Sequence, residues 1–483
     1  MNKSFIRYIV GVVLGIEGLL LLLTSLVGII YHEKQFLIYF ICGLVYTVIG
    51  VISFRVKPKN NAFFAKEGFI MVALSWIVLS ICGAVPICLT GEIPYYIDAL
   101  FEIVSGFTTT GSTIMTDVES LSHVSAFWRL FTHWIGGMGI LVFVLALLPM
   151  AGGYAINILK AESPGPNADR MVSRVSSTAR YLYQLYLAIT LLETLLLKIS
   201  GMPLFDSLTL SFATAGTGGF GLLNDSFGSY TSVQQIIVGV FMLLFGVNFS
   251  VYYGILVGKT KEMLKSEELK IYLSIVAVAV GLITINIYTN NFYSSIPESL
   301  KHAFFQVSSI ITTTGFSSCD FNLWPMLSKT ILVTLMFIGA CAGSTGGGIK
   351  VSRIIVLFKD AKYAILRAIN PRSVYVVRFE GKKVDDGTLE SIKSFLSLYA
   401  LVFIVSILLI SLDNYSYGVN FTAVAATINN IGPGLELIGP MGNFSIFSPL
   451  SKIVLIFDML AGRLELLPMI ILFSPIYSYK KKH

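Results

Sequence analysis

Residues 105–112 read Ser-Gly-Phe-Thr-Thr-Thr-Gly-Ser, and a similar polar turn ends an apolar stretch at three later places in the chain. The four turns are Thr108-Thr109-Thr110-Gly111, Gly216-Thr217-Gly218-Gly219, Thr312-Thr313-Thr314-Gly315 and Asn429-Asn430-Ile431-Gly432. Glycine permits the left-handed backbone that turns main-chain carbonyl groups inward. Four such turns around one axis would form a ring of carbonyl groups, which can replace the water shell of a cation. The sequence therefore predicts a fold organised around four quasi-equivalent turns.

The composition indicates an all-α integral membrane protein. Of the 483 residues, 55% are hydrophobic and 13% are charged, whereas about 25% are charged in a typical soluble domain. A helix needs about 20 apolar residues to cross a bilayer. Ten stretches meet this requirement, near residues 5–30, 35–54, 67–90, 127–150, 179–199, 232–257, 270–289, 327–345, 390–411 and 448–473. The first stretch has no convincing small-residue cleavage site, so we expect a retained helix and not a signal peptide.

Charged residues predict the orientation in the membrane. Of the 34 Lys and Arg residues, 27 fall in residues 3–7, 55–66, 160–180, 259–270, 350–393 and 480–482. These segments alternate with the hairpin tops, so the positive-inside rule places both termini in the cytoplasm. Their dispersal through short loops argues against nucleic acid as a partner. The opposite face collects carboxylates, which form either an acidic vestibule that concentrates cations or ordinary solvated loops: Glu33, Glu92, Asp98, Asp117, Glu119, Asp206, Asp225, Glu298, Asp320 and Asp413.

After two N-terminal transmembrane helices, residues 1–60, the chain divides into four pore repeats. We expect repeat boundaries at residues 61–160, 161–262, 263–370 and 371–483, each with the order helix, pore half-helix, filter loop, helix. The half-helices are Ile97–Phe107, Pro203–Ala215, Pro297–Ile311 and Gly418–Ile428. They are too short to span the bilayer. Non-helical backbone at membrane depth is tolerated only in a protein interior or beside water, so a pseudo-fourfold pore is the predicted architecture.

These motifs resemble the Trk/Ktr/HKT superfamily of potassium and sodium transporters, specifically the bacterial Trk-type membrane subunit, over the whole chain. The resemblance implies a single-file filter formed by Thr109, Thr110, Gly111, Ser112, Thr217, Gly218, Gly219, Phe220, Thr313, Thr314, Gly315, Phe316, Asn430, Ile431, Gly432 and Pro433. It implies potassium sites at Thr110, Gly111, Gly218, Gly219, Thr314, Gly315, Ile431 and Gly432. Repeats two and four depart from the Thr-Thr-Thr-Gly pattern. Serine in place of the first filter glycine favours sodium in the plant branch, so Gly111 implies potassium.

A gate is expected in the second helix of repeat three. Residues 339–348 hold five glycines, each of which costs about 1 kcal/mol in a helix interior. The resemblance makes this segment an intramembrane gating loop, with Gly343, Ser344, Thr345, Gly346, Gly347 and Gly348 as gate residues. Arg463 lies in the last apolar run, where a charge needs a partner or water. The family places a matching arginine beside the gating loop, and the alternative partners are Asp458 and Glu465 in the same helix.

The resemblance also implies potassium uptake across the bacterial cytoplasmic (inner) membrane, with potassium as the transported ion and no organic cofactor in this chain. It implies a homodimer and a cytosolic nucleotide-binding regulatory subunit that docks on basic loops such as 259–270 and 350–393. A sodium-permeable or sodium-coupled transporter and a non-conducting membrane sensor remain alternatives. An enzyme is not expected, because no nucleophile–base pair or ligand cluster appears. His123, His133 and His302 are expected at outer helix ends, outside any metal site.

Overall fold

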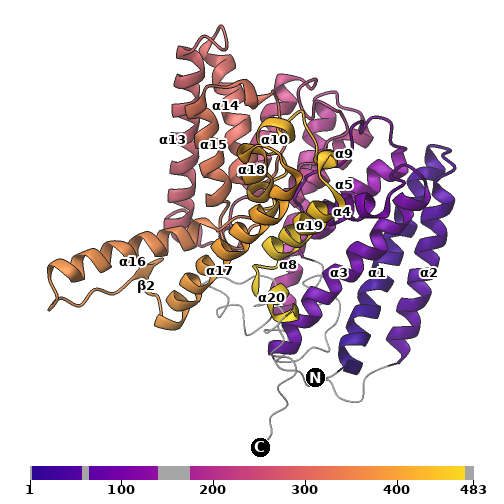
Figure 1. The fold of residues 1–483 in the computed structure, drawn as a ribbon, viewed down its shortest axis with the longest axis horizontal. Helices are drawn as coiled ribbons and strands as arrows, with labels where there is room; N and C mark the ends of the chain where they lie inside the picture. The colour runs from indigo at the N-terminus through magenta and orange to yellow at the C-terminus, as the bar shows by residue number, and fades with distance from the viewer. Residues whose placement is uncertain (1–2, 57–64, 140–174, 474–483) are drawn as a thin grey trace, which may run out of the picture.

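Helices form nearly all of the fold (Figure 1). The computed structural model describes the chain except for residues 1–2, 57–64, 140–174 and 474–483. The basic segment at 480–482 lies outside the described residues, as do most of the segments at 55–66 and 160–180. The strands in the described part are β1 (Arg378–Phe379) and β2 (Lys382–Lys383), which pair antiparallel.

The structure contains several long apolar helices. Within the described residues, six helices are long and apolar enough to cross a membrane: α1 (Lys3–Ile30), α2 (Phe36–Arg55), α3 (Ala65–Leu89), α8 (Val175–Ile199), α13 (Glu267–Thr289) and α17 (Asp386–Ile410). Several carry exposed apolar side chains, as α17 does at Leu401, Ile404 and Leu408. Such side chains can contact lipid tails, which are as apolar as leucine. The six helices confirm six of the ten predicted spans, and α1 and α2 lie together at one edge of the molecule (Figure 1).

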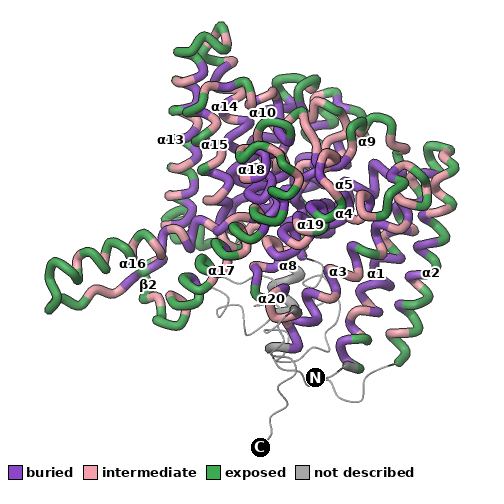
Figure 2. The backbone as a smooth tube through the Cα atoms, in the orientation of Figure 1, coloured by how far each residue is buried: buried purple, intermediate pink, exposed green. Residues whose placement is uncertain are grey.

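Four short helices occupy the buried interior (Figure 2). They are α4 (Tyr96–Phe107), α9 (Leu204–Gly216), α14 (Ile296–Ile311) and α18 (Tyr417–Ile428). They match the predicted half-helices to within a residue at each end. At 12, 13, 16 and 12 residues, they reach about 18–24 Å at 1.5 Å per residue. None is long enough to cross a bilayer.

In three of the four units the second helix is shorter than the sequence predicted. In place of spans near 232–257, 327–345 and 448–473, the structure has α10 (Ser232–Phe245), α15 (Met326–Ile338) and α19 (Pro449–Arg463). In the first unit α5 (His123–Gly137) begins four residues before the span predicted near 127–150, and residues 140–150 of that span lie outside the described part. The break after α10 bends the chain by 86° into α11 (Phe249–Leu256). Asn248 begins α11 by accepting a hydrogen bond from the Ser250 amide, because an amide side chain can replace the missing helical acceptor. The prediction of one uninterrupted helix over 232–257 was wrong, whereas the predicted interruption at 339–348 is confirmed, because α15 ends at Ile338.

The remaining elements lie at the ends of these helices or outside the bundle. They are α12 (Thr260–Met263), α16 (Val351–Ile369), α20 (Leu467–Phe473), and the 3-10 helices η3 (Phe321–Leu323), η4 (Ser411–Asp413), η5 (Glu436–Ile438) and η6 (Phe444–Ile446). Helix α16 runs away from the bundle, with β2 beside it (Figure 1). Glu380, between β1 and β2, accepts hydrogen bonds from the Ser266 hydroxyl and the Glu268 amide at 2.7 and 3.0 Å. The hairpin is thereby anchored to the start of α13.

Helices α1 and α2 meet at glycines, and a larger side chain there should destabilise the protein. A Cβ atom added at Gly50 would lie 2.2 Å from the Cα atom of Gly15. We expect Gly50→Val to cost about 1–3 kcal/mol of stability by overpacking and to lower the thermal unfolding midpoint in detergent. Gly281→Val in α13 is the matched control, because a Cβ atom there meets nothing within 4 Å. Equal midpoints for the two variants would contradict tight packing of α1 on α2.

Candidate functional site

The four predicted turns share one backbone geometry at the ends of the short helices. In each turn an amide donates to a carbonyl five residues earlier: Thr110 to Ser105, Gly218 to Ala213, Thr314 to Ser309 and Ile431 to Ala426, at 2.8–2.9 Å. The residue before each donor is left-handed, with φ of 55° at Thr109, 56° at Thr217, 57° at Thr313 and 54° at Asn430. This is the usual hydrogen-bonded way to end a helix. Repeats two and four therefore keep the turn geometry despite their different side chains.

The turns form a closed ring around one axis. A Cβ atom added at Gly111 would lie 2.1 Å from the carbonyl oxygen of Gly218, one at Gly219 would lie 1.9 Å from that of Thr314, and one at Gly315 would lie 2.0 Å from that of Ile431. The ring closes where a Cβ atom at Gly432 would lie 2.9 Å from the carbonyl oxygen of Thr110. All four glycines have positive φ, between 77° and 108°. The backbone conformation and the close carbonyl groups both require glycine here.

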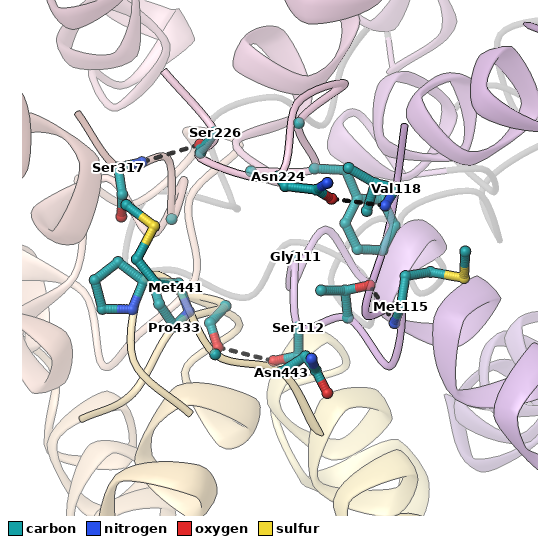
Figure 3. A pocket seen from close by; sticks show the side chains of 18 of the residues that line it. Gly111, Ser112, Met115, Val118, Asn224, Ser226, Ser317, Pro433, Met441 and Asn443 are labelled. Carbon is teal, nitrogen blue, oxygen red and sulfur yellow. Dashed lines mark hydrogen bonds between the residues drawn. The ribbon is translucent and has the colours of Figure 1, made fainter. Parts of the chain in front are cut away.

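A cavity of about 140 Å³ opens at this ring. The four glycines line it together with Ser112, Phe220 and Pro433, whereas Phe316 is buried against Phe227. Figure 3 shows segments from four parts of the chain around the opening. Hydrogen bonds join neighbouring segments, since Ser112 Oγ donates to the Gly432 carbonyl at 3.0 Å and the Ser317 amide donates to Ser226 Oγ at 3.2 Å. Seven of the sixteen predicted filter residues therefore line the cavity, and their role in a filter stays a prediction.

The wall of the cavity is not acidic. Within the described residues, no Asp or Glu lines it. Several of the outer carboxylates hold structure instead: Glu33 accepts from the amides of His123 and Val124 at the start of α5, and Asp98 pairs with Lys452 at 2.6 Å. The short helices end at the ring, and their carboxyl-terminal ends carry partial negative charge. A cation at the ring would therefore be attracted by these helix ends and by neutral oxygens.

The predicted gate segment lies directly against two of the turns. The Gly347 amide donates to Thr313 Oγ1 at 2.6 Å, and the Gly348 amide donates to the Asn429 carbonyl at 3.2 Å. The segment also fills the break between α10 and α11, where the Cys341 amide donates to the Gly246 carbonyl at 3.1 Å. Its backbone groups are therefore satisfied by three other parts of the chain, as buried non-helical backbone requires.

Arg463 reaches this segment from the end of α19. Its guanidinium donates to the Thr345 carbonyl at 2.8 Å and to the Gly136 and Gly137 carbonyls at 2.5 and 2.8 Å. The predicted position beside the loop is confirmed. The alternative partners have contacts of their own, because Asp458 accepts from the Ser406 hydroxyl at 2.7 Å and Glu465 pairs with Arg353. Arg463 thus joins the loop to the end of α5.

The sequence predicted His133 at an outer helix end, but the structure places it elsewhere. It is fully buried in α5, where Nδ1 lies 2.8 Å from the Gly106 carbonyl and Nε2 accepts from the Phe220 amide at 3.2 Å. The two contacts assign the proton to Nδ1. Sequence reasoning also missed Glu102 in α4 and Arg129 in α5, although a charged residue in a membrane segment is itself a signal of function.

These features define a membrane cation transport protein. A sequence profile of the TrkH family, described as a cation transport protein, matches residues 32–482, and the chain belongs to this family. The chain is 36% identical to the Trk system potassium uptake protein TrkH of Salmonella typhimurium and 32% identical to TrkG of Escherichia coli, over 99% of each chain in both cases. The crystal structure of the potassium transporter TrkH from Vibrio parahaemolyticus superposes with a TM-score of 0.89 at 31% identity, covering 99% of this chain and all of that one.

Proposed function

We propose that this chain takes up potassium across the bacterial cytoplasmic membrane through a filter formed by the four turns. The observation that carries the proposal is the closed ring of four glycines, each beside the carbonyl oxygen of the next turn. Such a ring can exchange the water shell of an ion for carbonyl oxygens. The membrane potential would drive the flux inward, at about 2.3 kcal/mol per charge for each 100 mV.

The proposed ion sites use the carbonyl groups around Thr110–Gly111, Gly218–Gly219, Thr314–Gly315 and Ile431–Gly432. The names of the relatives in Salmonella and Escherichia support potassium as the ion. A glycine at position 111 agrees with that choice. We treat the four pore repeats, with the boundaries predicted from the sequence, as the structural units of the filter.

The segment Gly343–Gly348 is the proposed gate, and Arg463 is its restraint. Small residues allow the loop to move, while the hydrogen bonds to Thr313, Asn429 and Arg463 hold it against the turns. A fixed positive charge beside the path also raises an electrostatic barrier to cations. In this proposal the described arrangement restricts permeation, and displacement of the loop permits it.

The relatives belong to a Trk system by name, which supports the proposal that further subunits act with this chain. We propose a homodimer with both termini in the cytoplasm. A cytosolic nucleotide-binding subunit would dock on the basic segments at 259–270 and 350–393. Both segments reach the gate, because the Glu268 carboxylate accepts from the Ala342 amide at 2.7 Å and Lys350 donates to the Gly346 carbonyl. Docking there could be transmitted to the loop directly.

Tracer flux into proteoliposomes tests the function. We expect the purified full-length chain to take up rubidium, a substitute for potassium, well above protein-free liposomes and well above sodium. Equal entry of sodium would instead indicate a sodium-permeable transporter. Absence of both fluxes, in the wild type and in the gate variant Arg463→Gln, would indicate a non-conducting membrane sensor. Either result would contradict the proposal.

A further inference from the structure

A buried ion pair lies beside the first two turns of the ring. Glu102 is in α4 and Arg129 is in α5, and their side chains are 0% and 2% exposed. Glu102 Oε1 lies 2.5 Å from Arg129 Nε. Removing two charges from water is costly, and a buried pair often stabilises a protein no better than apolar residues of similar size. The presence of this pair therefore needs an explanation other than stability.

Glu102 holds the chain that follows the first filter turn. Its two carboxylate oxygens accept from Thr113 Oγ1 at 2.9 and 3.1 Å, and Oε2 also accepts from the Ile114 amide at 2.9 Å. Thr113 is two residues beyond Gly111. The carboxylate thus fixes the position from which the first turn leaves the ring.

Arg129 holds the corresponding chain after the second turn. Its Nη1 atom donates to the Gly221 carbonyl at 3.1 Å, and its guanidinium carbon lies 3.6 Å from the centre of the Phe220 ring. Gly221 is two residues beyond Gly219. Arg129 also lines the cavity at the ring, where its charge would repel an entering cation if Glu102 did not neutralise it. The pair therefore joins the turn exits, the residues that follow two neighbouring filter turns, and carries no net charge.

The other three repeats do without such a pair. Nine residues before the filter glycine, where repeat one has Glu102, the later repeats have Leu210, Gln306 and Ala423. Arg129 is the seventh residue after the N-cap of α5. The seventh residues after the N-caps of α10, α15 and α19 are Val238, Leu332 and Leu455. Those three side chains are fully buried. Apolar packing thus suffices at this position, and what distinguishes the charged pair is its hydrogen bonds to the two turn exits.

We propose that Glu102 and Arg129 are a positioning pair that sets the discrimination between potassium and sodium at the first half of the ring. A filter selects between ions through the number and spacing of its carbonyl groups. Tying Thr113 and Gly221 to one rigid pair fixes the spacing between the Gly111 and Gly219 turns. The proposal rests on the ion-uptake function and adds to it which side chains hold the filter geometry.

Glu102→Gln tests the proposal, because glutamine keeps the shape of the side chain and removes its charge. We expect the ratio of rubidium to sodium uptake in proteoliposomes to fall about tenfold, which corresponds to losing one charge-assisted hydrogen bond. Asp98→Asn is the matched control. Asp98 is one helical turn earlier in α4 and pairs with Lys452 of α19. It therefore forms an ion pair, as Glu102 does, but has no hydrogen bond to the residues that follow the filter turns. Its ratio should equal that of the wild type.

A milder variant keeps the test decisive if Glu102→Gln does not fold. Thr113→Val removes the hydroxyl that donates to Glu102 and accepts from the Met115 amide at 3.0 Å, and leaves Glu102 and its pair with Arg129 in place. We expect it to lower the ratio about threefold. An unchanged ratio in the recoverable variants, with rubidium-selective uptake in the wild type, would overturn the positioning role alone. Absence of selective uptake in the wild type would overturn the proposed function itself. If the variants unfold at a lower temperature but keep the wild-type ratio of rubidium to sodium uptake, the pair stabilises the fold and does not set selectivity.

Discussion

Alanine at Gly219 should reduce rubidium uptake to the level of protein-free liposomes. The added Cβ atom would lie 1.9 Å from the Thr314 carbonyl oxygen, where real contacts are essentially never below 3.0 Å. That oxygen must therefore move by about 1 Å, and alanine must also adopt a φ of 77°, which is strained for any residue with a side chain. A displaced carbonyl no longer replaces ion hydration, so we expect flux to be lost while the protein remains in the membrane.

Gly201→Ala is the matched control for that experiment. Gly201, between α8 and α9, has a φ of 91°, but a Cβ atom there meets nothing within 4 Å. The control therefore has the same kind of backbone strain without the contact to a filter carbonyl. We expect it to retain uptake. Normal uptake by Gly219→Ala, or equal loss in both variants, would contradict a role for the ring in coordinating the ion.

Replacement of Arg463 by glutamine should raise uptake. Arginine donates to the Thr345 carbonyl of the loop and to the Gly136 and Gly137 carbonyls of α5. Hydrogen bonds from a charged group contribute about 1.5–3 kcal/mol each, so weakening one of them favours displacement of the loop by roughly tenfold. We expect rubidium uptake by Arg463→Gln to rise by roughly that factor, measured as the initial rate in proteoliposomes with equal amounts of protein.

Two further variants separate the restraint from a general effect of charge. Arg463→Lys keeps the charge but lacks the planar fork that reaches several carbonyls at once, and its uptake should lie between the wild type and Arg463→Gln. Arg367→Gln changes a half-exposed arginine of α16 that pairs with Asp360, and its uptake should equal that of the wild type. If Arg463→Gln also takes up rubidium at the wild-type rate, this arginine does not restrain the gate.

Much of the pore could be predicted from sequence because its signals are local. A half-helix followed by a polar turn and glycine is contained in about fifteen residues, and the bounds of α4, α9, α14 and α18 were correct to within a residue. The equivalence of the four turns was less evident, since Asn429-Asn430-Ile431 carries none of the threonines of repeat one. The structure explains this equivalence. The turn is made by backbone hydrogen bonds around one left-handed residue, and asparagine adopts that conformation more readily than threonine does.

The break between α10 and α11 could not be predicted because it depends on distant partners. Residues 246–248 read Gly-Val-Asn inside an apolar run, which is compatible with a continuous helix. The break becomes favourable only when the Cys341 amide and the Gly343 carbonyl supply hydrogen bonds to Gly246 and Phe249. Those partners lie about 95 residues away in the chain, so a local sequence window does not contain them.

The buried polar residues beside the ring escaped prediction for a related reason. Glu102 and Arg129 are 27 residues apart, with no helical spacing to connect them. His133 follows Arg129 by four residues and therefore shares its helix face, but its partners Gly106 and Phe220 belong to two different repeats. Only the packing of α5 against both α4 and α9 brings the three side chains to the turns.

Under the proposed function, the contacts of Gly347 with Thr313 and of Gly348 with Asn429 would link ion occupancy and gate position thermodynamically. A loop that leaves removes a hydrogen-bond donor from each of two filter turns, and thereby changes how favourably those turns hold an ion. Linkage is reciprocal, so an ion bound more tightly in one gate state stabilises that state by the same free energy. External potassium would then act as an effector of its own entry, and the concentration that half-activates uptake would shift with any variant that changes the two loop contacts.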